Sequence, residues 1–573
     1  MTFTLDLRAL LAAPAAFALA PPSPDATGDT TGVEPIELLH AVRSHAENIT
    51  IFSQVGEISL PPSRRVFAFL ESSVVPVTAP RHGVVHPKVW VLRYRSEEDP
   101  SETCLRVLSG SRNLTFDTSW DTILRLDQSL NGPGVPVVEL ADMFDSLAAC
   151  SQGSLDSRHA ERVGSLGSDL RSALFALPDG VDSLTFHVFG FEPRSHPFPE
   201  TPDRSLVISP FVSDDFFQQL KTPQLGTLVS RPESLDGLDP HSFDRVEEVL
   251  VFDDGGEIDL AKGDALAPAD PGRPLEGLHA KLFAFELGER AAVYCGSANA
   301  TGAAFGSNVE VLAELQGSRS SLGIDVLLGS GIDEPGMRSL FLPYRRNIEE
   351  PANDPEVAGS RADQVRRSLA RLDVVAAAVQ SNGGWTVSYS SSDAVALREG
   401  VVASCWPLTT PGNRRTVEDG KPLDESFATT LEAISGFLAW EVVDEESGQV
   451  SSCVVPVQIA GVPEERNAAL LRVLIGSAER FFRYLLAMLE DDPLQSSFLD
   501  AIEQLHDGPP EARSRELLPV LEKILRSMRR DPARLLALDP LVRALAADDA
   551  LPAGFDALWS SALQIARQRV VSQ

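Results

Sequence analysis

A short set of chemically capable side chains occurs twice in the chain. Each copy has a histidine and a lysine two places apart, followed later by the sequence Gly-Ser-x-Asn. The residues are His86, Lys88, Ser111 and Asn113 in the first copy, and His279, Lys281, Ser297 and Asn299 in the second. The chain has ten histidines and only six lysines. Random placement in 573 residues would give roughly 0.1 His-x-Lys pairs, so the repeat is a real signal.

The sequence around each copy predicts a strand, a turn and a second strand. Residues i and i+2 of a strand point to the same face, so His86 and Lys88 share one face and His279 and Lys281 share another. Glycine at the end of the following strand permits a tight turn, and the asparagine three residues later can direct its amide N–H groups into the same cleft. Two copies facing each other would gather two imidazoles, two ammonium groups and two amides around one centre.

Such a set of groups suits the cleavage of a phosphodiester without a metal ion. Ammonium and amide groups hold the charge that develops on the equatorial oxygens of the transition state. One imidazole attacks phosphorus and becomes a phosphohistidine, while the other protonates the leaving oxygen and later activates water. Two roles therefore require two histidines.

The doubled His-x-Lys and Gly-Ser-x-Asn pattern resembles the phospholipase D superfamily, which includes phospholipases, phosphatidyltransferases, bacterial nucleases and tyrosyl-DNA phosphodiesterase. The resemblance covers residues 1–345, and its motif is specific to the superfamily but not to a substrate. It implies that His86 and His279 are the nucleophile and acid/base pair, with attack assigned to His86. It also implies that the phosphate is bound by Lys88, Lys281, Asn113 and Asn299.

The same resemblance suggests which residues support the histidines. A carboxylate downstream of the asparagine often orients the histidine through its other ring nitrogen, and Asp121 and Glu310 are the candidates. Ser111 and Ser297 are predicted to form turns and hydrogen bonds rather than to act as nucleophiles. The SPFVSDD stretch and the LVSRPES stretch, which contains Arg231, could border the cleft, but a strand end and a loop are favoured there.

One position departs from the family pattern. The full motif has an aspartate five places after the lysine, where this chain has Arg93 in the first copy and Glu286 in the second. Members similar to tyrosyl-DNA phosphodiesterase also lack this aspartate. The departure therefore does not exclude activity, although it weakens the analogy with the lipid enzymes.

Composition limits the classes of function. The net charge of −33 argues against a cation-coated surface that binds nucleic acid nonspecifically, so a polyanion would need a local basic site. The stretch from Arg81 to Arg125 holds enough arginines to supply one. The five cysteines show neither zinc-ligand spacing nor a disulfide framework. We therefore expect no metal and no cofactor.

Strands that alternate with helices predict an α/β fold. We expect two pseudo-symmetric phospholipase-D-like sheet-and-helix halves, followed by a small β-rich accessory domain and an all-helical C-terminal domain. The chain is accordingly divided into residues 1–150, 151–348, 349–460 and 461–573. Local patterns further predict a strand over TFTLDL, a hairpin loop over 95–103, and helices over 35–45, 511–529, 533–547 and 554–570.

The N-terminal run LRALLAAPAAFALAPP could belong to a signal peptide, but its leader is not basic. A strand followed by a helix is favoured there. No apolar run reaches the roughly 18 residues that a membrane span needs, so a cytoplasmic protein without a membrane partner is expected.

These observations favour a metal-independent phosphodiesterase, most simply a nuclease that acts on DNA or RNA through a phosphohistidine. A role in bacterial anti-phage defence or DNA processing is the accompanying hypothesis. A helicase or another defence component would then dock on residues 349–573. Two alternatives stay open: a phospholipase D or phosphatidyltransferase, and an inactive scaffold with the same fold.

Overall fold

The computed structural model describes most of the chain. The described residues are 1–19, 46, 48–62, 65–96, 99, 101–117, 119–153, 155–252, 277–329, 336–346, 360–381, 383–475, 524–525, 539 and 555–572. The fold is a mixed α/β fold with several sheets. The predicted helices over 35–45, 511–529 and 533–547 lie almost wholly outside the described residues. Within the described residues, no helix combines the length and apolar character needed to cross a bilayer.

The chain divides into two compact units that interleave along the sequence. The first unit comprises Met1–Asp6, Ile51–Ile58 and Val75–Ser360, and the second comprises Leu7–Thr50, Ser59–Val74 and Arg361–Gln573. The predicted division at residues 150, 348 and 460 stays a prediction, and this grouping differs from it in placing 7–50 and 59–74 with the C-terminal part of the chain.

A buried ion pair contributes to this grouping. Arg466 lies 2.8 Å from the Glu71 carboxylate and also donates to the carbonyl oxygen of Ile434 at 2.6 Å. Burial raises the pKa of Glu71, and the Arg466 charge opposes that shift. Removing one partner of such a pair leaves an uncompensated buried charge, so the interaction fixes the segment around Glu71 within the second unit.

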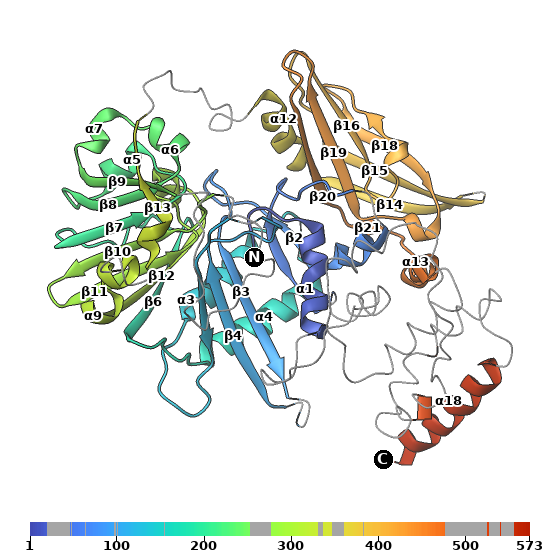
Figure 1. Ribbon diagram of the computed structural model, residues 1–573. Coiled ribbons are helices and arrows are strands. Elements are labelled where there is room, and N and C mark those ends of the chain that lie inside the picture. The colour runs from blue at the N-terminus through green and yellow to red at the C-terminus, as the bar shows by residue number, and fades with distance from the viewer. Residues whose placement is uncertain are drawn as a thin grey trace, which may run out of the picture. The chain divides into compact units, whose positions relative to one another are not determined.

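The first unit contains an eight-stranded sheet (Figure 1). Its order is β13-β9-β8-β7-β10-β11-β12-β6. Strands β7, β8 and β9 are parallel, and the other neighbours are antiparallel. The strands are β6 (Val181–Phe189), β7 (Arg204–Ile208), β8 (Leu225–Ser230), β9 (Val246–Phe252), β10 (Leu282–Leu287), β11 (Arg290–Gly296), β12 (Glu310–Ser318) and β13 (Phe341–Pro343).

Short helices accompany this sheet. They are α5 (Asp214–Gln219), α6 (Pro232–Asp236), α7 (Pro240–Phe243), α8 (Gly302–Gly306), α9 (Arg319–Leu322), α10 (Ile324–Leu328) and η2 (Met337–Leu340). Strand β10 reads LFAFEL and is buried along five of its six residues, as expected for a central strand covered on both faces. One core cluster includes Phe283 and Phe285, and another includes Leu282 and Ala284. The two clusters fix the strands that follow the second His-x-Lys copy.

The first His-x-Lys copy lies in a smaller antiparallel sheet of the same unit. Its order is β3-β4-β5, with β3 at Lys88–Arg95, β4 at Thr103–Gly110 and β5 at Ile123–Asp127. The connection between β3 and β4 confirms the predicted hairpin loop. Helices α3 (Val138–Ala149) and α4 (Ser157–Ser172) follow. Together with a two-stranded pair, β1 (Ile51–Gln54) and β2 (Val74–Val77), they complete this region.

The predicted strand over TFTLDL is replaced by isolated bridges. Thr2 pairs with Ser53, while Leu5 pairs with both Ile58 and Leu114. Helix α1 (Leu7–Leu19) begins directly afterwards. Residues 1–6 thus cross several segments of the first unit, and their side chains are held next to the Gly-Ser-x-Asn turn of the first copy.

The second unit contains two four-stranded sheets in the region predicted to be β-rich (Figure 1). Their orders are β18-β15-β14-β21 and β17-β16-β19-β20. The strands are β14 (Val374–Ser381), β15 (Gly384–Ala394), β16 (Val401–Pro407), β17 (Arg415–Thr416), β18 (Pro422–Thr429), β19 (Phe437–Asp444), β20 (Val450–Pro456) and β21 (Ile459–Ala460). The helices are η1 (Arg65–Ser73), α12 (Arg361–Ala370), η3 (Pro411–Asn413), η4 (Leu431–Ala433), α13 (Arg466–Ile475) and α18 (Phe555–Ser572).

Candidate active site

The two His-x-Lys copies occupy matching places in their sheets. Lys88 is the first residue of β3, and Lys281 directly precedes β10. Gly110 and Gly296 end the next strands, β4 and β11. A side chain at Gly296 would meet the carbonyl oxygen of Val311 at 2.2 Å, so the turn into Ser297 requires glycine. The histidines thus precede the strands, whereas the sequence placed them within the strands.

The backbone joins the two copies crosswise. The residue before each histidine forms a parallel bridge with the residue before a carboxylate of the other copy, as Val85 with Val309 and Leu278 with Trp120. The His86 N–H donates to the Val309 carbonyl at 2.9 Å, and the His279 N–H donates to the Trp120 carbonyl at 3.0 Å. These reciprocal bridges and hydrogen bonds bring the two copies of the motif together.

Each imidazole hydrogen-bonds to a carboxylate of the opposite copy. Nδ1 of His86 lies 3.0 Å from the Glu310 carboxylate, and Nδ1 of His279 lies 2.7 Å from Oδ1 of Asp121. An ionised carboxylate only accepts hydrogen bonds, so it selects the tautomer that carries the proton on Nδ1. Both Nε2 atoms are then available for chemistry. The sequence predicted these two carboxylates, but it did not predict that each would contact the histidine of the other copy.

The two serines hold these carboxylates. The Ser111 hydroxyl donates to Asp121 at 2.7 Å, and the Ser297 hydroxyl donates to Glu310 at 2.5 Å. Each serine oxygen also accepts a backbone N–H, from Thr122 at 2.9 Å and Val311 at 3.0 Å. The serines thereby fix the carboxylates that face the imidazoles.

Both lysines are buried beside the histidines. The ammonium of Lys88 donates to the carbonyl of His86, and that of Lys281 donates to the carbonyl of His279, each at 2.7 Å. Their exposed fractions are 3% and 0%. Burial lowers the pKa of Lys281 to about 7 and depresses the pKa of Lys88, which the charge of Lys281 lowers further. The charges of Glu310 and Asp121 oppose these shifts in part, and an anion bound beside the two lysines would oppose them further.

Burial also keeps the imidazoles neutral near pH 7. It lowers the pKa of His86 to about 4, despite the opposing charge of Glu310. It lowers the pKa of His279 as well, and the hydrogen bond that His279 donates to Asp121 offsets part of that shift. Lys88 and Lys281 contribute to both depressions. A bound anion would counter the lysine charges and raise both pKa values.

The two asparagines have different surroundings. Oδ1 of Asn113 accepts the N–H groups of Phe3 and Thr4 at 3.3 and 3.4 Å, and lies 3.4 Å from the Thr2 hydroxyl. Its NH₂ group is therefore directed away from this segment. Oδ1 of Asn299 is buried and makes no hydrogen bond in the described part of the chain. Only the first asparagine has its amide orientation fixed.

The two positions that depart from the family motif hold helices in place. Arg93 contacts Asp169 at 2.7 Å and Ser165 at 3.0 Å, both on α4. Glu286 is fully buried and accepts the N–H of Ile324 at 2.8 Å, at the start of α10. These contacts account for the unusual charges at both positions without a role in phosphate chemistry.

Two further neighbours lie beside the site, and the sequence suggested only the first, Arg231, as a possible border of the cleft. Nε of Arg231, directly after β8, donates to the carbonyl of Leu278 at 2.8 Å, and the charge of Arg231 depresses the pKa of Lys281. Its guanidinium lies 5.3 Å from the ring of Phe211, which is 48% exposed. Phe3 packs on His86 with 5.2 Å between the ring centroids. No local sequence signal links these residues to the motifs.

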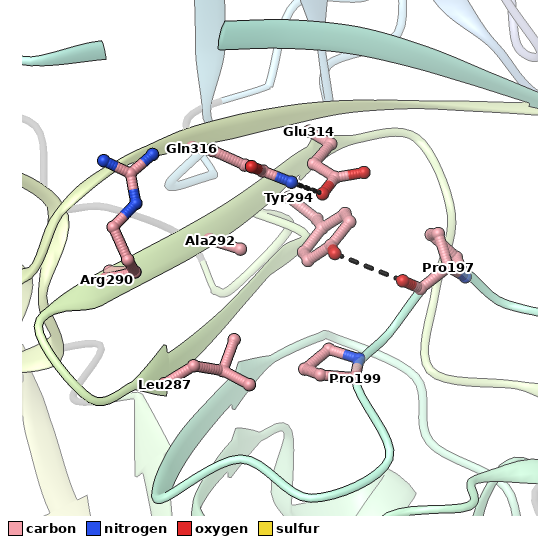
Figure 2. Close-up of a pocket in the computed structure, with 9 residues that line it drawn as sticks. Pro197, Pro199, Leu287, Arg290, Ala292, Tyr294, Glu314 and Gln316 are labelled. Atoms are coloured by element: carbon pink, nitrogen blue, oxygen red, sulfur yellow. Dashed lines mark hydrogen bonds between the residues drawn. The ribbon is translucent and has the colours of Figure 1, made fainter. Parts of the chain in front are cut away.

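A pocket elsewhere on the large sheet contains none of the motif residues. Its volume is about 400 Å³, and it is lined by Pro197, Pro199, Leu287, Arg290, Ala291, Ala292, Tyr294, Glu314 and Gln316. Figure 2 shows the Tyr294 hydroxyl donating to the Pro197 carbonyl, at 3.2 Å. The Gln316 side chain donates to Glu314 at 2.6 Å, and Glu314 also contacts His187 outside the pocket. Among the described residues, no group of three or more His, Cys, Asp or Glu side chains is arranged to hold a metal ion.

The chain has remote similarity to solved structures. No protein-family model matches the chain, and no curated protein matches it. A crystal structure of polyphosphate kinase from Porphyromonas gingivalis is 13% identical, with a TM-score of 0.28, over 54% of this chain. The match spans 42% of that chain, less than half its length. Its activity is not carried over to this protein.

Proposed function

We propose that the protein is a metal-independent phosphodiesterase of the phospholipase D type, built from two pseudo-symmetric halves, and that it cleaves nucleic acid. The observation that carries this proposal is the crosswise assembly of two His–Lys–carboxylate sets. A structural role for the motifs would require neither two buried lysines nor two oriented imidazoles, because burying a charged group costs stability.

The reaction follows from the assembled groups. Neutral Nε2 of His86 attacks phosphorus, the bond to the leaving oxygen breaks, and protonated His279 gives its proton to that oxygen. Neutral His279 then takes a proton from water as the water oxygen attacks phosphorus. The phosphorus–nitrogen bond breaks and returns neutral His86. The net change is addition of one water across the phosphodiester bond.

The buried lysines supply the positive charge that these reaction steps need. A phosphodiester anion between Lys88 and Lys281 would offset the charges that depress the pKa of His279. Substrate binding would thereby favour the protonated form of His279, the form that serves as general acid. His86 is neutral because its pKa is about 4, as a nucleophile requires.

The pair formed by Arg231 and Phe211 favours nucleic acid as the substrate. A guanidinium next to the second motif offers donors that suit a flanking phosphate, and an exposed ring offers a surface for base stacking. A single strand provides both a phosphate and an unpaired base next to the cleaved bond. A phospholipid provides no base.

A substrate panel in EDTA tests the proposal. Labelled single-stranded DNA, double-stranded DNA, RNA and phospholipid vesicles are incubated with the full chain, and products are separated on gels or plates. We expect cleavage of at least one nucleic acid at an undiminished rate in EDTA. Cleavage confined to the vesicles, or strict dependence on added magnesium, would overturn the proposed function.

Substrate binding is expected to weaken above neutral pH. The folded-state pKa of Lys281 lies at about 7, so its ammonium is lost as the pH rises through that value. A phosphodiester keeps its charge over this range, so KM should rise by up to about tenfold per pH unit above 7 if only charged Lys281 binds it. Measuring KM for a dinucleotide from pH 5.5 to 9 checks this. A constant KM would contradict it.

Loss of the pair next to the second motif should affect long substrates selectively. Arg231→Ala and Phe211→Ala are each expected to raise KM for single-stranded DNA by about tenfold, because each removes one stacking or phosphate contact. KM for a minimal diester such as bis(p-nitrophenyl) phosphate should change little. Arg125→Ala is a suitable control because the Arg125 side chain is exposed. Arg245→Ala is unsuitable because the Arg245 guanidinium contacts several buried carbonyls. Equal effects on long and minimal substrates would contradict this use of the pair.

A further inference from the structure

The first six residues of the chain are built into the candidate site. The Thr2 N–H donates to the Phe52 carbonyl at 3.1 Å, and the Leu5 N–H donates to the Glu57 carbonyl at 3.0 Å. The Asp6 N–H donates to the Leu114 carbonyl at 3.0 Å, directly after the first Gly-Ser-x-Asn turn. Thr2, Leu5 and Asp6 are buried. The backbone of this segment is therefore fixed on both sides of Phe3.

Phe3 faces two of the proposed catalytic groups. Its ring centroid lies 5.2 Å from that of the His86 imidazole, with the planes tilted by 60°. The Lys88 ammonium lies 5.9 Å from the centroid of the same ring. An aromatic face attracts a cation and covers an imidazole with apolar surface. The ring thus limits how His86 can rotate about its hydrogen bond to Glu310.

The same segment sets the orientation of Asn113. Its carbonyl oxygen accepts the N–H groups of Phe3 and Thr4, so the amide NH₂ points away from the segment. Thr2 supports this geometry, because its hydroxyl accepts the Leu114 N–H at 2.9 Å and donates to the Thr4 carbonyl at 2.7 Å. One short segment therefore contacts three of the first copy's candidate residues: His86, Lys88 and Asn113.

The second copy has no equivalent. Among the described residues, no aromatic ring packs on His279, and the carbonyl oxygen of Asn299 has no hydrogen-bonding partner. The two sets of candidate residues are thus chemically unequal although their motifs match. The first has an apolar wall and a fixed amide, as suits a nucleophile held in one attack geometry.

We propose that residues 2–4 form a working wall of the active site, in which Phe3 positions His86 for attack and the backbone of Phe3 and Thr4 aims the amide of Asn113 at the phosphate. The proposal rests on the proposed function for its catalytic meaning. Its structural content, the control of His86 by Phe3, is testable without any substrate.

The direct test is NMR titration of His86 in the full chain. Besides Phe3, the groups that face this imidazole are Glu310, Lys88 and Lys281. Phe3→Ala leaves those charges in place but admits water to the ring, so the pKa of His86 should rise from about 4 toward its ordinary value of 6.5. Phe3→Tyr keeps the ring and should leave the value unchanged. An unchanged pKa in Phe3→Ala would overturn the proposal even if the enzyme cleaves nucleic acid.

Kinetics separate the two roles of the segment. Phe3→Ala should lower kcat by about 10- to 100-fold with little change in KM, because His86 loses its attack geometry while Asn113 keeps its backbone donors. In Phe3→Ala, the acidic limb of the plot of kcat/KM against pH should shift to higher pH, because the pKa of His86 rises. Thr2→Val should instead raise KM and leave that limb in place. Phe175→Leu, a core substitution without a contact to the site, controls for lost stability. Equal responses of Phe3→Ala and Phe175→Leu would overturn the proposal. Absence of cleavage in the unmodified chain would sink only the proposed function.

Discussion

Replacing His86 or His279 with alanine is expected to lower kcat by at least about a thousandfold, because each imidazole carries one obligatory covalent or proton-transfer step. The double variant should retain about the same kcat as the less active single variant, because the losses from groups that act as a unit do not add. Rates are measured by single-turnover cleavage of the best nucleic acid from the EDTA panel. His241→Ala is the matched control, because its side chain is 91% exposed.

The two histidine variants should differ in one respect. With an activated substrate such as p-nitrophenyl thymidine phosphate, the leaving group needs no acid, so His279→Ala can still form the phosphohistidine on His86 but cannot release it quickly. An acid-labile, alkali-stable label on the protein is therefore expected in His279→Ala and not in His86→Ala. A label on His279 in His86→Ala would reverse the assignment of nucleophile and acid. Full activity of both variants would eliminate the mechanism.

The carboxylates should be nearly as important as the histidines. Glu310→Gln and Asp121→Asn are each expected to lower kcat by about 10²- to 10⁴-fold, because an amide neither selects the same imidazole tautomer nor stabilises an imidazolium. Circular dichroism and thermal melting check that each variant is folded. The loss should appear in kcat rather than in KM, since neither carboxylate is placed to bind the anionic substrate.

Strand β12 supplies a matched control for this prediction. Glu314 lies four residues after Glu310 and contacts Nε2 of His187 at 2.6 Å, outside the motifs. Glu314→Gln therefore breaks a similar His–carboxylate pair on the same strand and should leave kcat nearly unchanged. If Glu310→Gln and Glu314→Gln reduce activity equally, the effect belongs to the strand and not to the catalytic pair.

The sequence predicted which residues make up the candidate site better than it predicted the hydrogen bonds between them. The rare His-x-Lys pairs and the glycine turns are local patterns, and they identified every motif residue that the structure brings together. The exchange of carboxylates was not predictable, because His86 and Glu310 are 224 residues apart and His279 and Asp121 are 158 apart. Phe3 was not predictable for the same reason, since nothing near residue 3 indicates a neighbour at residue 86.

Local periodicity predicts elements better than it predicts how they group. The helix predicted over 554–570 is present as α18, because periodicity reflects burial of one face of a local element. Periodicity carries no information about which unit an element packs in. The contact between Glu71 and Arg466 spans 395 residues, and it assigns the segment around Glu71 to the C-terminal part of the chain. The proposed docking of a helicase or defence component on residues 349–573 stays a prediction.

The crosswise hydrogen bonds have a consequence for how the protein is made. Until residue 310 has left the ribosome and folded, His86 lacks the carboxylate that orients its imidazole. Until residues 279–281 are in place, the first copy also lacks the second imidazole and the second ammonium group. A partly synthesised or proteolysed chain that contains only one copy therefore carries no complete reaction centre. Under the proposed function, an incomplete chain therefore cannot cleave nucleic acid while the protein is being made.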